Sequence, residues 1–190
     1  MSTIVAVKKA GEFAIAADSL TTWGGAKESA DYIVNHEKII TVGDSYLAIT
    51  GPTSAKLAIS EYFSSNKDVD LTNVKSIYRV WLKLHAALVN QYFMNSTESR
   101  NDAFESTRVD VLIANRSGIF GVEAHRVVQE FSKFYAYGTG WQVALGAMYS
   151  VYAHQARSAE DIARIGIEAS AEFDSDTGMP VVSYSGQLAE

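Results

Sequence analysis

The sequence of 190 residues contains no cysteine. A disulfide framework, a thiol nucleophile and a cysteine-based metal site are therefore excluded. No segment approaches the roughly 20 consecutive apolar residues that a membrane-spanning helix requires. The N-terminus also lacks the basic stretch and following apolar stretch of a secretory signal. We therefore expect a cytoplasmic protein that does not contact a membrane.

Concentrated positive charge is also absent from the sequence. The formal net charge is −6, and the lysines and arginines are scattered along the chain. Nucleic-acid binding needs a basic face, so we do not expect a nucleic-acid partner. The histidines show no ligand spacing, so we expect neither a metal site nor another cofactor; they are His36, His85, His125 and His154.

The order of apolar patterns predicts the fold class. The length suits one domain over residues 1–190, and no repeat, low-complexity tract or linker divides it. Strand patterns fill most of the first fifty residues and return at 109–122, 127–137 and 181–184, and helical patterns lie at 53–65, 72–93, 142–156 and 159–171. This order indicates an α+β protein with strands segregated from helices.

Two intermediate regions carry further expectations. Residues 95–106 are polar, and we expect an exposed loop there. On the helix over 72–93, Trp81 and Tyr92 follow helical spacing. We interpret them as core residues or as contacts between subunits, because this helix has apolar residues on more than one face.

Ser2 stands directly behind the initiator methionine, at the head of an apolar run. A small residue at this position allows methionine aminopeptidase to remove Met1. The chain would then begin with a hydroxyl and an α-amine on one residue, and the amine could take the hydroxyl proton as a base. The sequence thus offers an N-terminal nucleophile.

Two charged residues lie where strand patterns begin or end. Asp18 closes an apolar run, and Gly11 separates this run from the one that begins at Ser2. An antiparallel hairpin of the two runs would bring Asp18 beside Ser2. Lys38 opens a third strand pattern over 38–42.

Five short motifs together resemble those of a known enzyme group. They are Ser-Thr-Ile-Val at 2–5, Ala-Ala-Asp at 16–18, Lys38 before an apolar run, Gly-Thr-Gly at 138–140 and Asp-Ser-Asp-Thr-Gly at 174–178. In order and spacing they resemble the N-terminal-nucleophile hydrolases of the proteasome β-subunit and HslV group. The stretches at 16–22 and 43–46 look most like the betaproteobacterial-type proteasome homologues.

This resemblance implies a fold, an activity and a form of assembly. It implies a four-layer αββα sandwich of two antiparallel sheets, and a threonine/serine-type endopeptidase that cleaves unfolded polypeptides inside homo-oligomeric stacked rings. With no helix expected ahead of Ser2, the chain resembles the catalytic β type of subunit. No ATP-binding loop is present, so an ATPase that unfolds substrates would be a separate protein.

The resemblance also implies roles for residues of this sequence. Ser2 would be the nucleophile, although the family usually has threonine, whose methyl group restricts χ1. The Lys38 ammonium would lower the pKa of the α-amine, and Asp18 would keep Lys38 charged. Asp174 and Thr177 would brace the α-amine and Ser2 by hydrogen bonds.

Two further positions are carried over from the family. The backbone N–H of Ala48 would stabilise the oxyanion, in a place where glycine is usual. Thr139 would keep the hydroxyl of the family's serine. The simpler interpretations are that Ala48 is a plain core residue, that Thr139 caps the following helix, and that residues 174–178 end a helix with Gly178 as its cap.

The sequence leaves open which residues carry out the chemistry, and whether they do so. Thr3 could replace Ser2 as the nucleophile, and Lys27 is the rival of Lys38. If Met1 is retained, the α-amine belongs to the wrong residue, and the chain would be an inactive ring-forming scaffold. A small-molecule amidase with the same nucleophile chemistry is the third hypothesis for the function.

Overall fold

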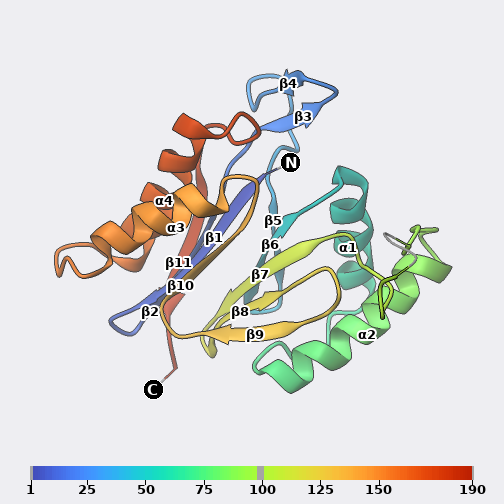
Figure 1. Cartoon of the computed structure of the whole chain (residues 1–190). Coiled ribbons are helices and arrows are strands. Elements are labelled where there is room, and N and C mark those ends of the chain that lie inside the picture. Colours follow the sequence, from blue (N-terminus) through green and yellow to red (C-terminus); the bar gives the residue numbers. More distant parts are fainter. Residues whose placement is uncertain (1, 98–100, 190) are drawn as a thin grey trace.

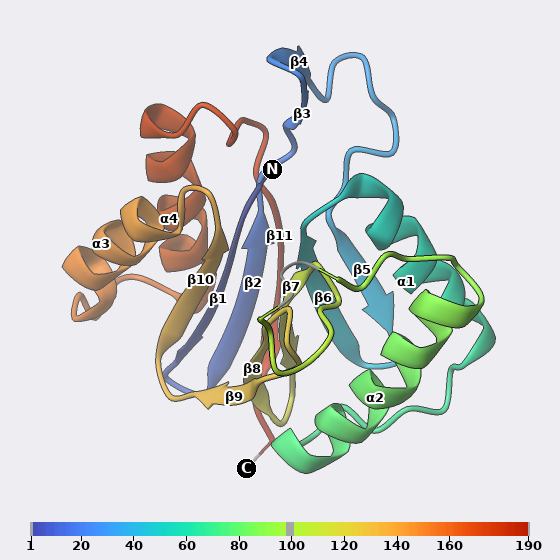
Figure 2. The same cartoon turned by 45° about the vertical axis from the view of Figure 1, so that its right-hand side comes forward.

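The computed structural model describes residues 2–97 and 101–189. Two antiparallel sheets pack face to face, and helices cover the outer face of each (Figure 1, Figure 2). This is the expected four-layer αββα sandwich, and the α+β class is confirmed.

The first sheet contains the N-terminal strand in an inner position. Its strands are, in spatial order, β10 (Phe134–Gly138), β1 (Thr3–Lys9), β2 (Glu12–Ala17) and β11 (Val182–Gln187). The expected hairpin of β1 and β2 is present, and the turn between them uses positive φ at Ala10 and Gly11. Thr3 pairs with Gly138 on one side, and Ile4 pairs with Ala17 on the other.

The second sheet consists of strands from the middle of the chain. In spatial order they are β5 (Ile39–Val42), β6 (Ser45–Thr50), β7 (Asp110–Asn115), β8 (Gly118–Val122) and β9 (Val128–Phe131). Residues 19–37, whose pattern was mixed, include a small separate sheet. It is formed by β3 (Thr21–Trp23) and β4 (Ala26–Glu28).

The helices divide between the two outer faces. The first pair is α1 (Thr53–Ser65) and α2 (Val74–Asn90), and the second pair is α3 (Trp141–Tyr152) and α4 (Ala159–Phe173). In both views α1 and α2 cover the second sheet, and α3 and α4 cover the first (Figure 1, Figure 2).

Three apolar layers hold the sandwich together. Ile4 and Ile15 meet Leu112 and Ile119 between the two sheets, while Val5 on the other face of β1 packs under α3 and α4. Because β1 and β2 are buried on both faces, their sequences are continuous apolar runs rather than alternating patterns. Each fully buried aliphatic side chain contributes about 1.5–3 kcal/mol.

Two expectations about elements are wrong. The pattern over 127–137 predicts one strand, but β9 and β10 belong to different sheets. The chain crosses between the sheets at Ser132 and Lys133, whose side chains are exposed. The long helix is also shorter than the pattern over 72–93, because Asn73 caps it at one end and Gln91 at the other.

The region 95–106 is only partly an exposed loop. Ser96 and Ser106 are buried, and the amide of Ser106 donates to the carbonyl of Ser96. Residues 98–100 lie outside the described residues.

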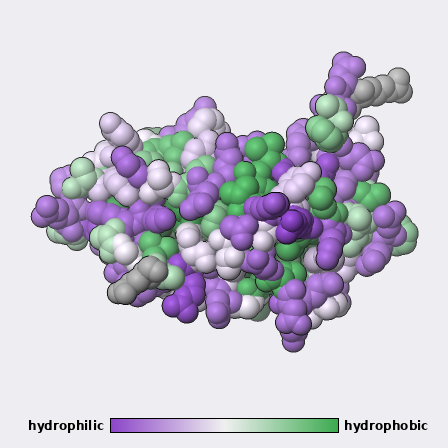
Figure 3. All heavy atoms as spheres, turned by 90° about the horizontal axis from the view of Figure 1, so that it is seen from below, coloured by the Kyte–Doolittle hydropathy of each residue, from purple (hydrophilic) through white to green (hydrophobic). Residues whose placement is uncertain are grey.

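Trp81 lies in the core between α2 and the second sheet, while Tyr78 and Leu82 of the same helix are about half exposed. The core interpretation of Trp81 is therefore confirmed. Seen from below, the molecule presents mainly hydrophilic side chains, with hydrophobic ones in small groups (Figure 3). None of the described helices combines the length and the apolar character needed to cross a bilayer.

Candidate active site

Ser2 lies at the upper end of β1, between the two neighbouring strands. It is 6% exposed, and its carbonyl accepts the amide proton of Thr139 at 3.0 Å. This bond continues the pairing of β1 with β10, so the backbone of Ser2 is held by the sheet. Met1, on which the nucleophile hypothesis depends, lies outside the described residues.

Asp18 follows the last residue of β2 and is surrounded by donors. Its Oδ1 accepts from Lys38 Nζ at 2.6 Å and from the amide of Thr3 at 3.0 Å. Its Oδ2 accepts from the amides of Leu20 at 3.1 Å and Gly178 at 3.0 Å. One carboxylate therefore joins β1, the end of β2, the C-terminal segment and Lys38.

Lys38 forms the ion pair that the sequence predicts, but in a buried setting. The side chains of Lys38 and Asp18 are 8% and 0% exposed. The Lys38 ammonium also donates to the carbonyl of Leu20 at 2.5 Å. Lys27, the rival, is exposed in β4. The pairing of Asp18 with Lys38 is confirmed, whereas the catalytic roles of both residues stay predictions.

Burial acts on both members of the pair. Desolvation raises the pKa of Asp18, and Lys38 and the backbone donors oppose this shift. Desolvation lowers the pKa of Lys38, and Asp18 opposes that shift. Each partner therefore offsets part of the cost to the other of leaving water, and desolvation remains the larger effect on both pKa values.

A second set of hydrogen bonds at the start of β1 runs from Gly140 through Thr3 and Thr177 to Asp174. The amide of Gly140 donates to Thr3 Oγ1 at 3.0 Å, and Thr3 Oγ1 lies 2.6 Å from Thr177 Oγ1. Thr177 and Thr139 both donate to Oδ2 of Asp174 at 2.5 Å. Because the Thr177 proton goes to Asp174, the Thr3 hydroxyl must donate to Thr177. The chain thus ends on a carboxylate, where cooperative bonds are strongest.

This chain changes the expected partners of Asp174 and Thr177. The sequence predicts that they brace Ser2, but their described bonds run to Thr3 and Thr139. The bracing of the α-amine and of Ser2 by Asp174 and Thr177 stays a prediction, because Met1 lies outside the described residues. The Thr3 hydroxyl already donates and accepts in a fully buried position, which leaves it no room to act as a nucleophile.

The two capping interpretations are wrong. Helix α3 begins after Gly140, and no side chain caps it, so Thr139 has no such role. Helix α4 ends at Phe173, and the residue that caps it is Asp174, in extended backbone, while Gly178 instead donates its amide to Asp18.

Ala48 does not lie where an oxyanion donor is needed. It is fully buried in the middle of β6, between Ile39 and Leu112. The amide of Ile49 points to β5, where it donates to Lys38, so the preceding Ala48 amide points to β7. Its N–H is directed into the sheet, and the expected oxyanion role does not fit this placement.

Gly51 lies at a position that the strand and helix patterns did not single out. It follows the last residue of β6 and adopts φ +137°, and a Cβ there would lie 2.7 Å from the carbonyl of Arg108. Only glycine suits this backbone. The signal in the sequence is the Gly51-Pro52 pair after the strand pattern.

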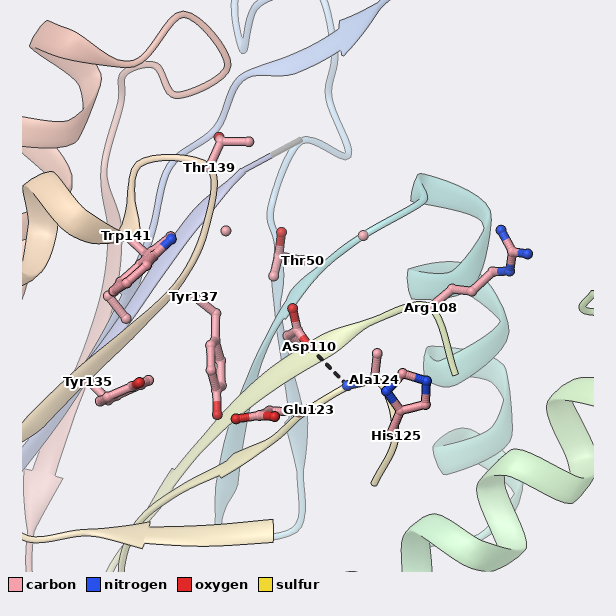
Figure 4. Close-up of a pocket in the computed structure, with 13 residues that line it drawn as sticks. Thr50, Arg108, Asp110, Glu123, Ala124, His125, Tyr135, Tyr137, Thr139 and Trp141 are labelled. Atoms are coloured by element: carbon pink, nitrogen blue, oxygen red, sulfur yellow. Dashed lines mark hydrogen bonds between the residues drawn. The ribbon is translucent and has the colours of Figure 1, made fainter. Parts of the chain in front are cut away.

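A cavity of about 570 Å³ is lined in part by Thr139, whose amide donates to the carbonyl of Ser2. Its lining includes Thr50, Gly51, Gly138 and Thr139, together with residues of β7, of β10 and of the segment that follows β8 (Figure 4). It lies on the β10 side of β1, whereas Asp18 follows β2 on the other side.

Solved structures resemble the chain over almost its whole length. A structure of Thiobacillus denitrificans BPH in complex with epoxomicin has 53% identity and a TM-score of 0.93, and covers 99% of this chain and 100% of that one. The chain belongs to the betaproteobacterial proteasome homologues. A second structure of Thiobacillus denitrificans BPH has 54% identity and a TM-score of 0.94, and covers 98% of both chains.

More distant structures share the fold of this family. HslV from Trypanosoma brucei has 17% identity and a TM-score of 0.65, and covers 97% of this chain and 99% of that one. The chain thus has the proteasome and HslV type of N-terminal-nucleophile hydrolase fold. No protein-family model and no curated protein matches the sequence. Among the residues that the structure describes, no three side chains of metal-binding type gather.

Proposed function

We propose that this chain is a proteasome-like peptidase that cuts unfolded polypeptides with Ser2 as its nucleophile. The observation that carries the proposal is the buried Lys38–Asp18 pair, which is fixed to the first strand through the amide of Thr3. A buried ammonium held at the start of β1 suits an N-terminal nucleophile. Structural stability alone gives little reason to keep such a pair.

The reaction begins with loss of Met1, which leaves the α-amine on Ser2. The amine takes the hydroxyl proton as Oγ attacks the carbonyl carbon of a peptide bond. The C–N bond then breaks, and the amine returns the proton to the leaving nitrogen. Water hydrolyses the resulting ester in the same way. Lys38 favours the unprotonated amine, because a nearby positive charge lowers its pKa.

The tetrahedral intermediate needs a donor for its negative oxygen. We assign this role to the amide of Gly51, which lies beyond the last strand residue of β6 and borders the cavity beside Thr139. A side chain at this position would collide with Arg108, so the close approach of the backbone depends on glycine.

Assembly into stacked rings is part of the proposal. Closed rings keep a general nucleophile away from folded proteins, and they are a common way for identical subunits to bury complementary surfaces. Tyr78 and Leu82 on the outer face of α2 offer an apolar surface for such a contact. A separate ATPase would be needed to unfold folded substrates.

Mass analysis, two variants of Ser2 and an inhibitor test the activity. Intact-mass analysis should find Met1 removed, and Ser2→Ala should abolish peptide hydrolysis while the melting temperature stays within the change caused by Ser65→Ala, an exposed control. Ser2→Thr should keep activity. Epoxomicin, which is bound in the structure of the relative from Thiobacillus denitrificans, should inhibit the wild type. Retained Met1 would favour the inactive scaffold, and hydrolysis by Ser2→Ala would overturn the nucleophile assignment.

Native mass spectrometry tests the assembly. A large closed oligomer is expected for the wild type, and Tyr78→Glu with Leu82→Glu should reduce it, while Lys83→Glu on the same helix should not. An active monomer or dimer would contradict the chambered peptidase and favour the small-molecule amidase.

A further inference from the structure

Lys38 follows a long segment of turns and irregular backbone. This segment covers residues 29–37, all of which the structure describes, and it leads from β4 to β5 beside α1 (Figure 2). Lys38 is held by its carbonyl, which accepts the amide proton of Ile49 at 3.0 Å, and by its ammonium, which bonds to Asp18. The placement of its side chain therefore also depends on what fixes the residues directly before it.

Lys56 fixes the end of this segment. From α1, Lys56 Nζ donates to the carbonyl of Glu37 at 2.5 Å and to that of Asn35 at 3.3 Å. The carbonyl of Glu37 belongs to the peptide group that joins Glu37 to Lys38. One ammonium therefore holds the peptide group from which Lys38 continues.

The side chain of Glu37 is held by a different element. The hydroxyl of Tyr184, on β11, donates to Glu37 Oε1 at 2.5 Å. This bond, together with burial and the negative charge of Glu37, raises the pKa of Tyr184 to about 12, so the hydroxyl remains a donor. The ring of Tyr184 stacks on Tyr46 with the centroids 4.7 Å apart. Glu37 is thus fixed at its carbonyl by α1 and at its carboxylate by β11.

The stability of α1 does not explain a lysine at position 56. Lys56 is the fourth residue of this helix, near the N-terminal end, where the helix dipole disfavours a cation. Burial lowers the pKa of Lys56, and the charge of Glu37 opposes this shift. The charge of Lys56 in turn acts to lower the pKa of Lys38. The cation therefore lies where it is unfavourable for the helix and where it acts on the ion pair beside Ser2.

We propose that Lys56 is a positioning residue for the Ser2 nucleophile, which fixes the peptide group before Lys38 and adds a second positive charge near it. This inference rests on the proposed function and extends it to a residue that does not touch the reacting atoms. The charged groups that act on the two lysines are Asp18 for Lys38 and Glu37 for Lys56, besides the lysines themselves. Without Lys56, the Lys38 ammonium would be held less firmly, and the α-amine would lose its proton less easily.

The test measures peptide hydrolysis across the pH range with protein from which Met1 has been removed. Lys56→Met should lower kcat roughly tenfold at neutral pH and change KM little, because the clamp acts on the nucleophile and not on substrate binding. The acid limb of kcat/KM, which reports the pKa of the base, should move upward by about half a pH unit, since loss of a positive charge raises the pKa of an amine. Lys56→Arg keeps the charge and the N–H donors and should restore both values.

Two further variants separate position from charge. Lys67→Met removes the same charge at an exposed position just after α1, and it should leave kcat and the acid limb unchanged. Tyr184→Phe keeps the stacked ring and the net charge but removes the bond to Glu37. It should lower kcat roughly threefold and move the acid limb in the same direction by a smaller amount.

The outcomes separate the role of Lys56 from the activity itself. An unmoved acid limb in Lys56→Met would overturn the proposal and leave the peptidase standing, even if kcat falls, because a general structural defect lowers the rate without changing the pKa of the base. A folded Lys56→Arg protein that behaves like Lys56→Met would also overturn it. If Lys56→Met does not fold, wild-type behaviour of Tyr184→Phe would do so. If the wild type hydrolyses no peptide, the proposed function fails.

Discussion

The Lys38 ammonium and the Thr3 amide share one oxygen atom of Asp18, at 2.6 Å and 3.0 Å. The charge that would act on the α-amine is therefore fixed to the backbone directly after Ser2. This oxygen atom therefore contributes to the stability of the fold and, in the proposed mechanism, to activity. Substitutions can separate the two contributions.

Replacing Lys38 by methionine should remove activity and also destabilise the fold. The substitution leaves the carboxylate of Asp18 buried without its ammonium, and removing one partner of a buried pair costs about 3–5 kcal/mol. Denaturant unfolding and peptide hydrolysis measure the two effects. Lys27→Met, at an exposed position, should change the free energy of unfolding by less than about 0.5 kcal/mol. Normal turnover by Lys38→Met would remove Lys38 from the mechanism.

Replacing both partners should behave differently and should depend on pH. Because folding raises the pKa of Asp18, this group stabilises the fold at pH values below its ordinary pKa of 3.8. The stabilisation is lost as the pH rises through the pKa in the folded state. Because folding lowers the pKa of Lys38, this group stabilises the fold at pH values above its ordinary pKa of 10.5. The stabilisation is lost as the pH falls through the pKa in the folded state. The pair therefore contributes least when both groups are charged.

The double variant Asp18→Asn with Lys38→Met should accordingly be inactive. The difference between its free energy of unfolding and that of the wild type should be most favourable to the variant near neutral pH. Its stability relative to the wild type should decline toward either pH limit. Urea unfolding across the pH range measures the difference. A single Asp18→Asn variant serves as the control, and a difference that does not vary with pH would contradict the directions of the two shifts.

Thr3→Val should lower both stability and activity. Valine has the shape of threonine without the hydroxyl, so the amide of Gly140 and the hydroxyl of Thr177 lose a partner in a buried place. An unsatisfied buried group costs about 1–3 kcal/mol. Thr3→Ser keeps the hydroxyl and should be much closer to the wild type. Equal activity of Thr3→Val and wild type would show that the chain of bonds does not position Ser2.

Gly138→Ala should prevent correct placement of Ser2. Gly138 adopts φ +100°, and a Cβ there would lie 1.8 Å from the carbonyl oxygen of Ser2. The same change at Gly146 meets nothing within 4 Å inside α3 and should stabilise by about 0.4–1 kcal/mol. Thermal unfolding of both variants, with hydrolysis assays, tests the contrast. A stable and active Gly138→Ala protein would contradict this close approach.

The Asp18–Lys38 pair could be predicted because both residues mark the ends of apolar runs. Side chains at strand ends meet at a sheet edge, so the pattern carries the information. The chain from Thr3 through Thr177 to Asp174 could not be predicted in this way. It depends on how the end of α4 packs against β1, and periodicity does not describe that packing.

The misplacement of the oxyanion donor has a similar origin. A strand pattern shows that Ala48 is buried, but not toward which neighbouring strand its amide points. That direction follows from the register of β5, β6 and β7. The division of residues 127–137 into β9 and β10 was missed for a related reason, since apolar residues continue while the chain moves to the other sheet.

The Gly178 amide that donates to Asp18, and the pairing of β11 with β2, have a consequence for the timing of synthesis. The ribosome makes Ser2 well over one hundred residues before it makes residues 174–187. Until these arrive, Asp18 lacks one of its donors, β2 has an open edge, and Thr3 has no Thr177 beside it. A half-made chain therefore lacks contacts around the proposed nucleophile, and if Ser2 acts as we propose, the growing polypeptide and its neighbours on the ribosome are spared from cleavage.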